Sequence, residues 1–122
     1  MMANMVTKID DYGVRKTILI GQESYYIALP AIFSGSANAV IKAGEPVTGD
    51  IEDRDTGFTA STSSPVGIAL HEVKLDADGK GNGTILLAGC VDLLKLEDSV
   101  VTNVNTAKAN LPKIIFVKGS AI

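Results

Sequence analysis

The sequence has few of the side chains that perform chemistry in proteins. Its 122 residues include no tryptophan, one cysteine and one histidine, and aromatic residues make up only 5%. The single cysteine, Cys90, allows neither a disulfide within the chain nor a multi-cysteine zinc site. With His71 as the only histidine, little material remains for acid–base or nucleophilic catalysis. The composition therefore argues against an enzyme.

Positive charge and long apolar runs are also scarce. Eleven lysines and arginines face 14 aspartates and glutamates, which gives a formal net charge of -3. A nucleic acid would therefore meet net repulsion. The longest nearly apolar stretch, 25–33, is too short to cross a bilayer. Residues 1–11 lack the basic and then apolar segments of a secretion signal. We expect a soluble protein that binds neither nucleic acid nor membrane.

What the chain does contain is enough for one folded domain. It is 46% hydrophobic and 20% charged, a balance typical of a chain that builds a core. A chain of this length buries about two thirds of the surface that it exposes when unfolded. We expect one domain.

Residues 1–37 differ from the rest because they hold four of the six aromatic residues. The runs 17–20 and 25–29 are β-prone, but neither alternates cleanly between apolar and polar residues. They indicate either an N-terminal hairpin packed on its own domain or an arm that becomes ordered on a partner. Tyrosine and phenylalanine are common interface anchors, which slightly favours the arm.

Residues 38–122 predict a compact β-rich domain, because short apolar runs alternate with glycines, prolines and acidic turns. The clearest local prediction is a hairpin, whose strands 66–75 and 84–91 flank the glycine-rich turn 76–83. A break of register is expected in the first of these strands, near Glu72.

A short strand at 39–41 and a polar loop at 52–65 precede the hairpin. After it, the spacing of the apolar residues predicts one helix over 98–110, ended by Pro112. The run 113–118 predicts a final strand. The fold class is thus mainly β with one short helix, a small α+β domain.

The acidic turn 76–83 does not have the spacing of a calcium loop. With Asp76 at the first position, Asp78 falls at the third, but Lys80 occupies the fifth. Leu87 stands at the twelfth, where a bidentate glutamate is needed. We therefore expect no metal site. Instead we expect an ordinary turn with positive φ at its glycines, Gly79, Gly81 and Gly83.

Other candidate catalytic groups do not combine into a site. The polar loop carries Arg54 among four carboxylates, which are Asp50, Glu52, Asp53 and Asp55. A hydrolase would need two of them at fixed separation, so a solvated acidic loop is expected. His71 and Glu72 are adjacent and would point to opposite faces of a strand. Cys90 lies among apolar residues, where a buried, inert thiol is usual. No catalytic residue or cofactor is predicted.

The order of the segments over 38–118 carries a family resemblance. The segments are AGEPVTGDI at 43–51, the loop end Ser64–Leu70, the acidic glycine turn, TILLAGCVDL at 84–93, the helix, and KIIFVK at 113–118. In this order they resemble the phage capsid decoration proteins of the lambda head protein D type.

The resemblance implies a small domain, sandwich-like or barrel-like, with an extended N-terminal arm. Such proteins are often homotrimers. They bind the outer surface of the expanded phage head and stabilise it against the pressure of packaged DNA. The implied partner is the major capsid protein, and the implied location is the virion, after a soluble stage in the host cytoplasm. The family has no catalytic residues.

On this basis residues 1–37 would be the capsid-binding arm and 38–122 the decoration domain. The arm residues expected to contact the capsid are Ile18, Ile20, Tyr25, Tyr26, Ile27 and Phe33. Alternatively, the arm contributes extra strands to the domain.

Two other functions remain open. The chain is another virion component, such as a head fibre base or a tail protein, or it is a small glycan-binding β module that uses the loop 52–65. Glycan sites usually rely on exposed aromatic platforms, and this loop offers only Phe58.

Overall fold

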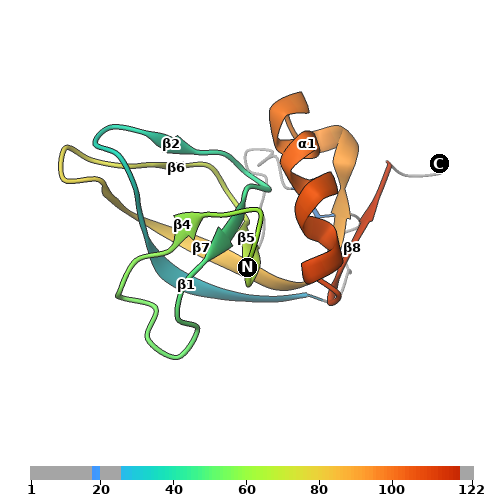
Figure 1. The fold of residues 1–122 in the computed structure, drawn as a ribbon, viewed down its shortest axis with the longest axis horizontal. Helices are drawn as coiled ribbons and strands as arrows, with labels where there is room; N and C mark the ends of the chain where they lie inside the picture. The colour runs from blue at the N-terminus through green and yellow to red at the C-terminus, as the bar shows by residue number, and fades with distance from the viewer. Residues whose placement is uncertain (1–17, 20–25, 119–122) are drawn as a thin grey trace, which may run out of the picture.

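The computed structural model describes residues 18–19 and 26–118. It is mainly β with one short α-helix, which confirms the predicted fold class (Figure 1). The strands are β1 (Ile27–Ser34), β2 (Val40–Ile41), β3 (Pro46–Thr48), β4 (Thr59–Ala60), β5 (Gly67–Ala69), β6 (Val73–Lys74), β7 (Lys80–Asp92) and β8 (Ile114–Val117). The helix is α1 (Asp98–Ala107), between the 3-10 turns η1 (Leu93–Lys95) and η2 (Lys108–Asn110).

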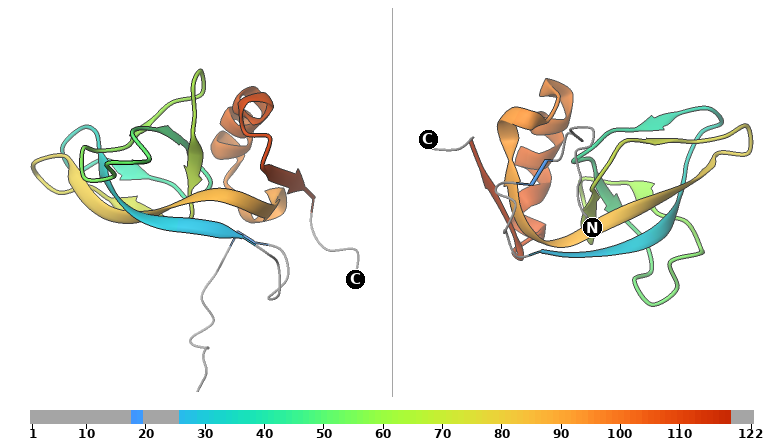
Figure 2. Two further views of the ribbon diagram at one scale, coloured as in Figure 1. Left: turned by 90° about the horizontal axis from the view of Figure 1, so that it is seen from below. Right: turned by 180° about the vertical axis from the view of Figure 1, so that it is seen from behind.

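The 13-residue strand β7 organises the main sheet. It pairs with β1 and β5 in antiparallel fashion and with β8 in parallel, and the sheet runs β1-β7-β5-β3-β4 with β8 on β7. Strands β2 and β6 form a second, two-stranded sheet. Figure 2 shows how strongly β1 and β7 curve.

The curvature brings the two ends of the main sheet together at a single point. Phe58, just before β4, forms an isolated parallel bridge with Phe33 of β1. The Phe58 N–H donates to the Ile32 carbonyl at 2.8 Å, and the Ser34 N–H donates to the Phe58 carbonyl at 2.8 Å. Among the described residues the sheet thus curls like a barrel without closing into one.

Two hydrophobic cores lie on opposite faces of the central strands. Ile68 and Leu86 belong to the helix core, which packs under α1, whereas their neighbours Ala69 and Ile85 belong to the sheet core inside the curl. Because side chains alternate across a strand, β5 and the central residues Ile85 and Leu86 of β7 are buried on both faces. This is why their sequences read as continuous apolar runs.

The predicted helix is confirmed as α1 followed directly by η2. Its buried residues Val100, Val104 and Ala107 have the spacing of one helix face, and they pack into the helix core. At its start, the Lys42 ammonium contacts the Glu97 carboxylate at 3.0 Å. The hydrogen bond and the charge of Glu97 raise the pKa of Lys42 above its usual value.

The hairpin is present in modified form. Its first strand is interrupted at residues 70–72, so that β5 pairs with β7 while β6 pairs with β2. The interruption confirms the expected break near Glu72. His71 and Glu72 both lie in the connection between β5 and β6. They therefore do not point to opposite faces of one strand, as the sequence had predicted.

The prediction for the glycines of the turn was only partly right. Gly79 has a φ of +74°, but Gly81 and Gly83 lie within β7 and do not have positive φ. Their lack of a side chain makes room for β6, because a Cβ on Gly83 would lie 2.6 Å from Val73 Cγ2. The Asp76 carboxylate completes the turn by accepting from the backbone N–H groups of Asp78 and Lys80.

Gly79→Ala is expected to destabilise the domain by about 1–3 kcal/mol, because alanine is strained at positive φ. The added Cβ would also meet the Gly35 carbonyl oxygen. Urea unfolding measures the loss. Asp78→Ala, an exposed neighbour whose side chain makes no hydrogen bond in the described part of the chain, is the control and should change little. Equal stability of the two variants would contradict the prediction.

Part of the region expected as an N-terminal arm belongs to the main sheet. Residues 27–34 form β1, whose eight residues pair with β7 and bury Ala31 and Phe33. The described parts of the two β-prone runs also pair with β7 and not with each other, since Leu19 bridges Val91. The structure thus agrees with the alternative in which this region adds strands to the domain. Residues 1–17 and 20–25 of the expected arm lie outside the described residues.

Candidate functional site

The predicted capsid-binding residues separate into three groups. Tyr26 and Ile27 are half-exposed at the start of β1, at 48% and 46% of their full surface. Ile18 and Phe33 are buried within the domain, and their role as capsid contacts stays a prediction. Ile18 contributes to the helix core and Phe33 to the sheet core. Ile20 and Tyr25 lie outside the described residues.

An irregularity in the pairing of β1 with β7 decides which side chains are exposed here. Ala28 pairs with Leu86, but Ile27 pairs with Ala88, so Leu87 is an extra residue in β7. Such a bulge changes which face the following side chains take. After it, Val91 points into the helix core, and Ala88 and Cys90 point to the other side.

We call this other side the outer face and define it by Ile27, Ala88, Cys90 and Ile115. Ile27 pairs with Ala88, and Ile115 of β8 pairs with Cys90, so all four share one side of the sheet. Ile115 is 60% exposed, and Ala88 and Cys90 are half-buried. Cys90 is therefore not the fully buried thiol that we expected. The result is an exposed apolar strip across three strands.

Tyr26 lies opposite Gly89, on the side of the sheet that faces the helix core and not on this strip, because the other nearest atoms to a Cβ on Gly89 belong to Leu19 and Leu86 of that core. Gly89 has a φ of +148°, and a Cβ there would lie 3.0 Å from the Tyr26 Cβ. A side chain at position 89 would therefore be strained and would push Tyr26 away. A glycine inside a strand often marks a bulge or a close approach, and that signal was present in the sequence.

Sequence reasoning missed Ile115 and Leu94, the two most exposed large apolar residues that the structure describes. The run 113–118 was predicted as a strand, and a strand half-buried against a core exposes every second residue. Which of Ile114 and Ile115 would be exposed depended on the position of β8 in the sheet.

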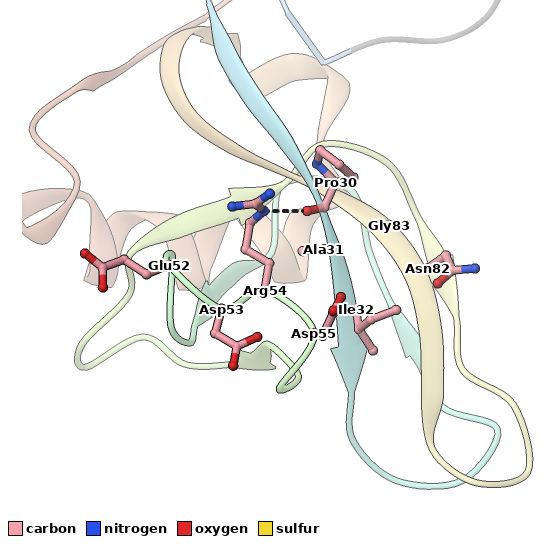
Figure 3. A pocket seen from close by; sticks show the side chains of 9 residues that line it. All are labelled: Pro30, Ala31, Ile32, Glu52, Asp53, Arg54, Asp55, Asn82 and Gly83. Carbon is pink, nitrogen blue, oxygen red and sulfur yellow. Dashed lines mark hydrogen bonds between the residues drawn. The ribbon is translucent and has the colours of Figure 1, made fainter.

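A shallow cavity of about 360 Å³ lies elsewhere, between β1 and the polar loop (Figure 3). The Arg54 guanidinium donates to the Pro30 carbonyl at 2.8 Å and to the Ile51 carbonyl at 3.0 Å. The Ile32 N–H donates to the Arg54 carbonyl at 3.0 Å. Arg54 thus fastens the polar loop to β1. The sequence had predicted only a solvated acidic loop.

The carboxylates around this cavity do not converge. Figure 3 shows those of Glu52, Asp53 and Asp55 pointing in different directions. In the described part of the chain, no three histidine, cysteine, aspartate or glutamate side chains are placed to hold a metal ion. The cavity is therefore explained as the gap beside a structural arginine.

Across residues 18–19 and 26–118, no helix has the length and apolar character needed to span a membrane. In comparisons with known proteins, no family model and no curated protein matches the chain. The outer face is thus the candidate functional site, on the grounds of its own geometry.

Proposed function

We propose that this chain is a phage capsid decoration protein. It binds the major capsid protein on the outer surface of the expanded head, as a homotrimer, and stabilises the shell against the pressure of packaged DNA. The role is structural and not enzymatic. The observation that carries the proposal is the apolar outer face, which includes Ile27 at the point where the N-terminal region joins the sheet. The ordered segment resemblance supports it.

The exposed apolar residues can contribute binding free energy when a partner covers them. Tyr26, Ile27 and Ile115 each retain about half of their surface, so covering one of them on a partner contributes about 1 kcal/mol. Such a contribution is modest at one site. Three linked copies engaging neighbouring shell subunits raise the effective concentration and strengthen the whole attachment.

The direct test is cosedimentation of the purified protein with heads assembled from the major shell protein encoded in the same genome. Binding should saturate on expanded heads and be much weaker on unexpanded ones, because expansion changes the outer surface. Absence of binding to both forms would exclude the proposal.

Replacing the exposed apolar pair tests the surface. Tyr26→Ser with Ile27→Ser is expected to weaken head binding at least about tenfold, because two half-exposed anchors are lost. Cosedimentation measures the affinity, and thermal unfolding checks that the variant folds. A matched control is Val40→Ser with Val66→Ser, which removes two other exposed apolar side chains. If both double variants bind equally well, the exposed start of β1 is not part of the contact surface.

The glycan-binding alternative loses its main residue, because Phe58 is fully buried and provides no platform. Another virion component remains the runner-up. Electron microscopy of particles carrying labelled protein separates the two, since decoration places label over the head and a fibre base or tail protein places it at one site.

A further inference from the structure

One edge of β8 has no partner strand in the part of the chain that the structure describes. β8 pairs only with β7, in parallel register, and Figure 1 shows it at the margin of the molecule beside α1. The other end of the main sheet differs, because Phe58 next to β4 returns to β1.

The register determines which backbone groups of β8 face outward. The Gly89 N–H donates to the Lys113 carbonyl at 3.2 Å. In a parallel ladder, the N–H and C=O of Ile115 then face β7, and those of Ile114 and Phe116 face away. The Ile114 N–H is used by the Leu111 carbonyl at 3.1 Å. The outward edge therefore offers the Phe116 N–H and the carbonyls of Ile114 and Phe116.

The charge around this edge is opposite to that of the whole protein. The segment 108–118 contains three lysines and no acidic residue, although the chain carries a net charge of -3. Lys108 and Lys113 precede β8 and Lys118 follows it, and all three are exposed. The ion pair between Lys42 and Glu97 lies at another place, at the start of α1.

We propose that the outer edge of β8 accepts an extended segment of a partner protein as an added strand. The segment has a short apolar stretch flanked by aspartates or glutamates. Backbone groups of Ile114 and Phe116 hold its main chain, Ile115 contacts its side chains, and the lysines at both ends attract its charged flanks. The proposal deepens the proposed function and rests on it in naming a shell subunit as the source of the segment.

A competing explanation for the lysines is that they prevent edge-to-edge aggregation of the sheet. Guarding residues commonly place a charge within the strand itself. β8 has no charged residue between Ile114 and Val117, and its central Ile115 is 60% exposed. The middle of the edge is therefore accessible to an added strand, and the lysines lie only at its two ends.

A synthetic peptide tests the edge without any capsid. The probe is a short peptide of alternating valine and threonine with aspartates at both ends, and its twin has lysines at both ends. At millimolar concentration and low salt, the acidic peptide should slow exchange of the Phe116 amide hydrogen about tenfold or more. The basic twin should have little effect. Equal protection by both peptides, or by neither, would overturn the proposal.

Variants that lack the lysines distinguish binding of an added strand from protection against aggregation. Lys113→Ser with Lys118→Ser should bind the acidic peptide about fivefold more weakly at low salt, and the difference should shrink at high salt. Lys74→Ser with Lys80→Ser, which removes the same charge from exposed positions near the other end of β7, is the matched control and should bind normally. If the first variant self-associates while its peptide affinity is unchanged, the lysines are guards and the docking proposal is wrong.

The same variants distinguish this proposal from the proposed function. When wild-type protein binds expanded heads and the Lys113 and Lys118 variant binds equally well, decoration stands and the edge proposal fails. When wild-type protein binds no heads but the acidic peptide protects Phe116, the edge binds strands and the decoration role fails.

Discussion

Deletion of residues 1–35 is expected to abolish cooperative folding. The deletion removes β1, which pairs along its whole length with β7, and it removes the buried side chain of Phe33. It also removes Ile18 and Leu19 from the helix core. Loss of a buried phenylalanine alone costs about 3–5 kcal/mol. A domain has a free energy of unfolding of only about 5–15 kcal/mol. The sum of these losses is expected to exceed it.

Deletion of residues 1–17 is the matched control, because it leaves every contact between described residues in place. Far-UV circular dichroism during urea unfolding should give a cooperative transition for this variant and none for the longer deletion. A cooperative transition after removal of residues 1–35 would mean that β1 is not part of the folding unit. The shorter deletion is also the correct variant for testing whether the N-terminal region binds heads, since the longer one confounds binding with folding.

The elements that the sequence predicted well depend on local patterns. The helix follows from the spacing of Val100, Val104 and Ala107, which one face of a helix reproduces without knowledge of its neighbours. The turn before β7 follows from Asp76 and Gly79, whose preferences act over a few residues. In both cases the physical cause lies within the segment itself.

The elements that the sequence did not predict depend on distant partners. β1 contains Pro30 and lacks clean alternation, and its place in the domain is set by β7 and by Phe58, which lies 25 residues after Phe33. The parallel pairing of β8 with β7 is equally non-local. No pattern within residues 27–34 distinguishes a strand of the domain from a strand that adds to a partner.

The candidate site could not be fully predicted from the sequence for the same reason, because it also depends on contacts between distant segments. Tyr26 and Ile27 were predicted as contact residues, and the structure leaves both exposed. The bulge at Leu87 turns Ala88 and Cys90 to the same side as Ile27. Ile115 joins Ile27 on the outer face only because β8 lies on the other side of β7. The arrangement is a property of the sheet register and not of any one segment.

Phe33→Ala and Phe58→Ala are each expected to destabilise the domain by about 3–5 kcal/mol. Both side chains are fully buried, and their ring centroids lie 6.4 Å apart with the ring planes inclined by 37°. They meet where the two ends of the curled sheet join. Gly49 makes room for this contact, because a Cβ there would lie 2.6 Å from Phe58 Cδ2.

The double variant tests whether the two rings act as a pair. Removing both should cost less than the sum of the single losses by about 0.5–1.5 kcal/mol, since the ring contact is lost only once. Phe116→Ala is the control, because Phe116 is half-buried and packs on the helix core instead. Its own loss should be smaller, and it should add to that of Phe33→Ala. Strict additivity of Phe33→Ala and Phe58→Ala in urea unfolding would show that the two ends of the sheet are held by their separate burial and not by contact between the rings.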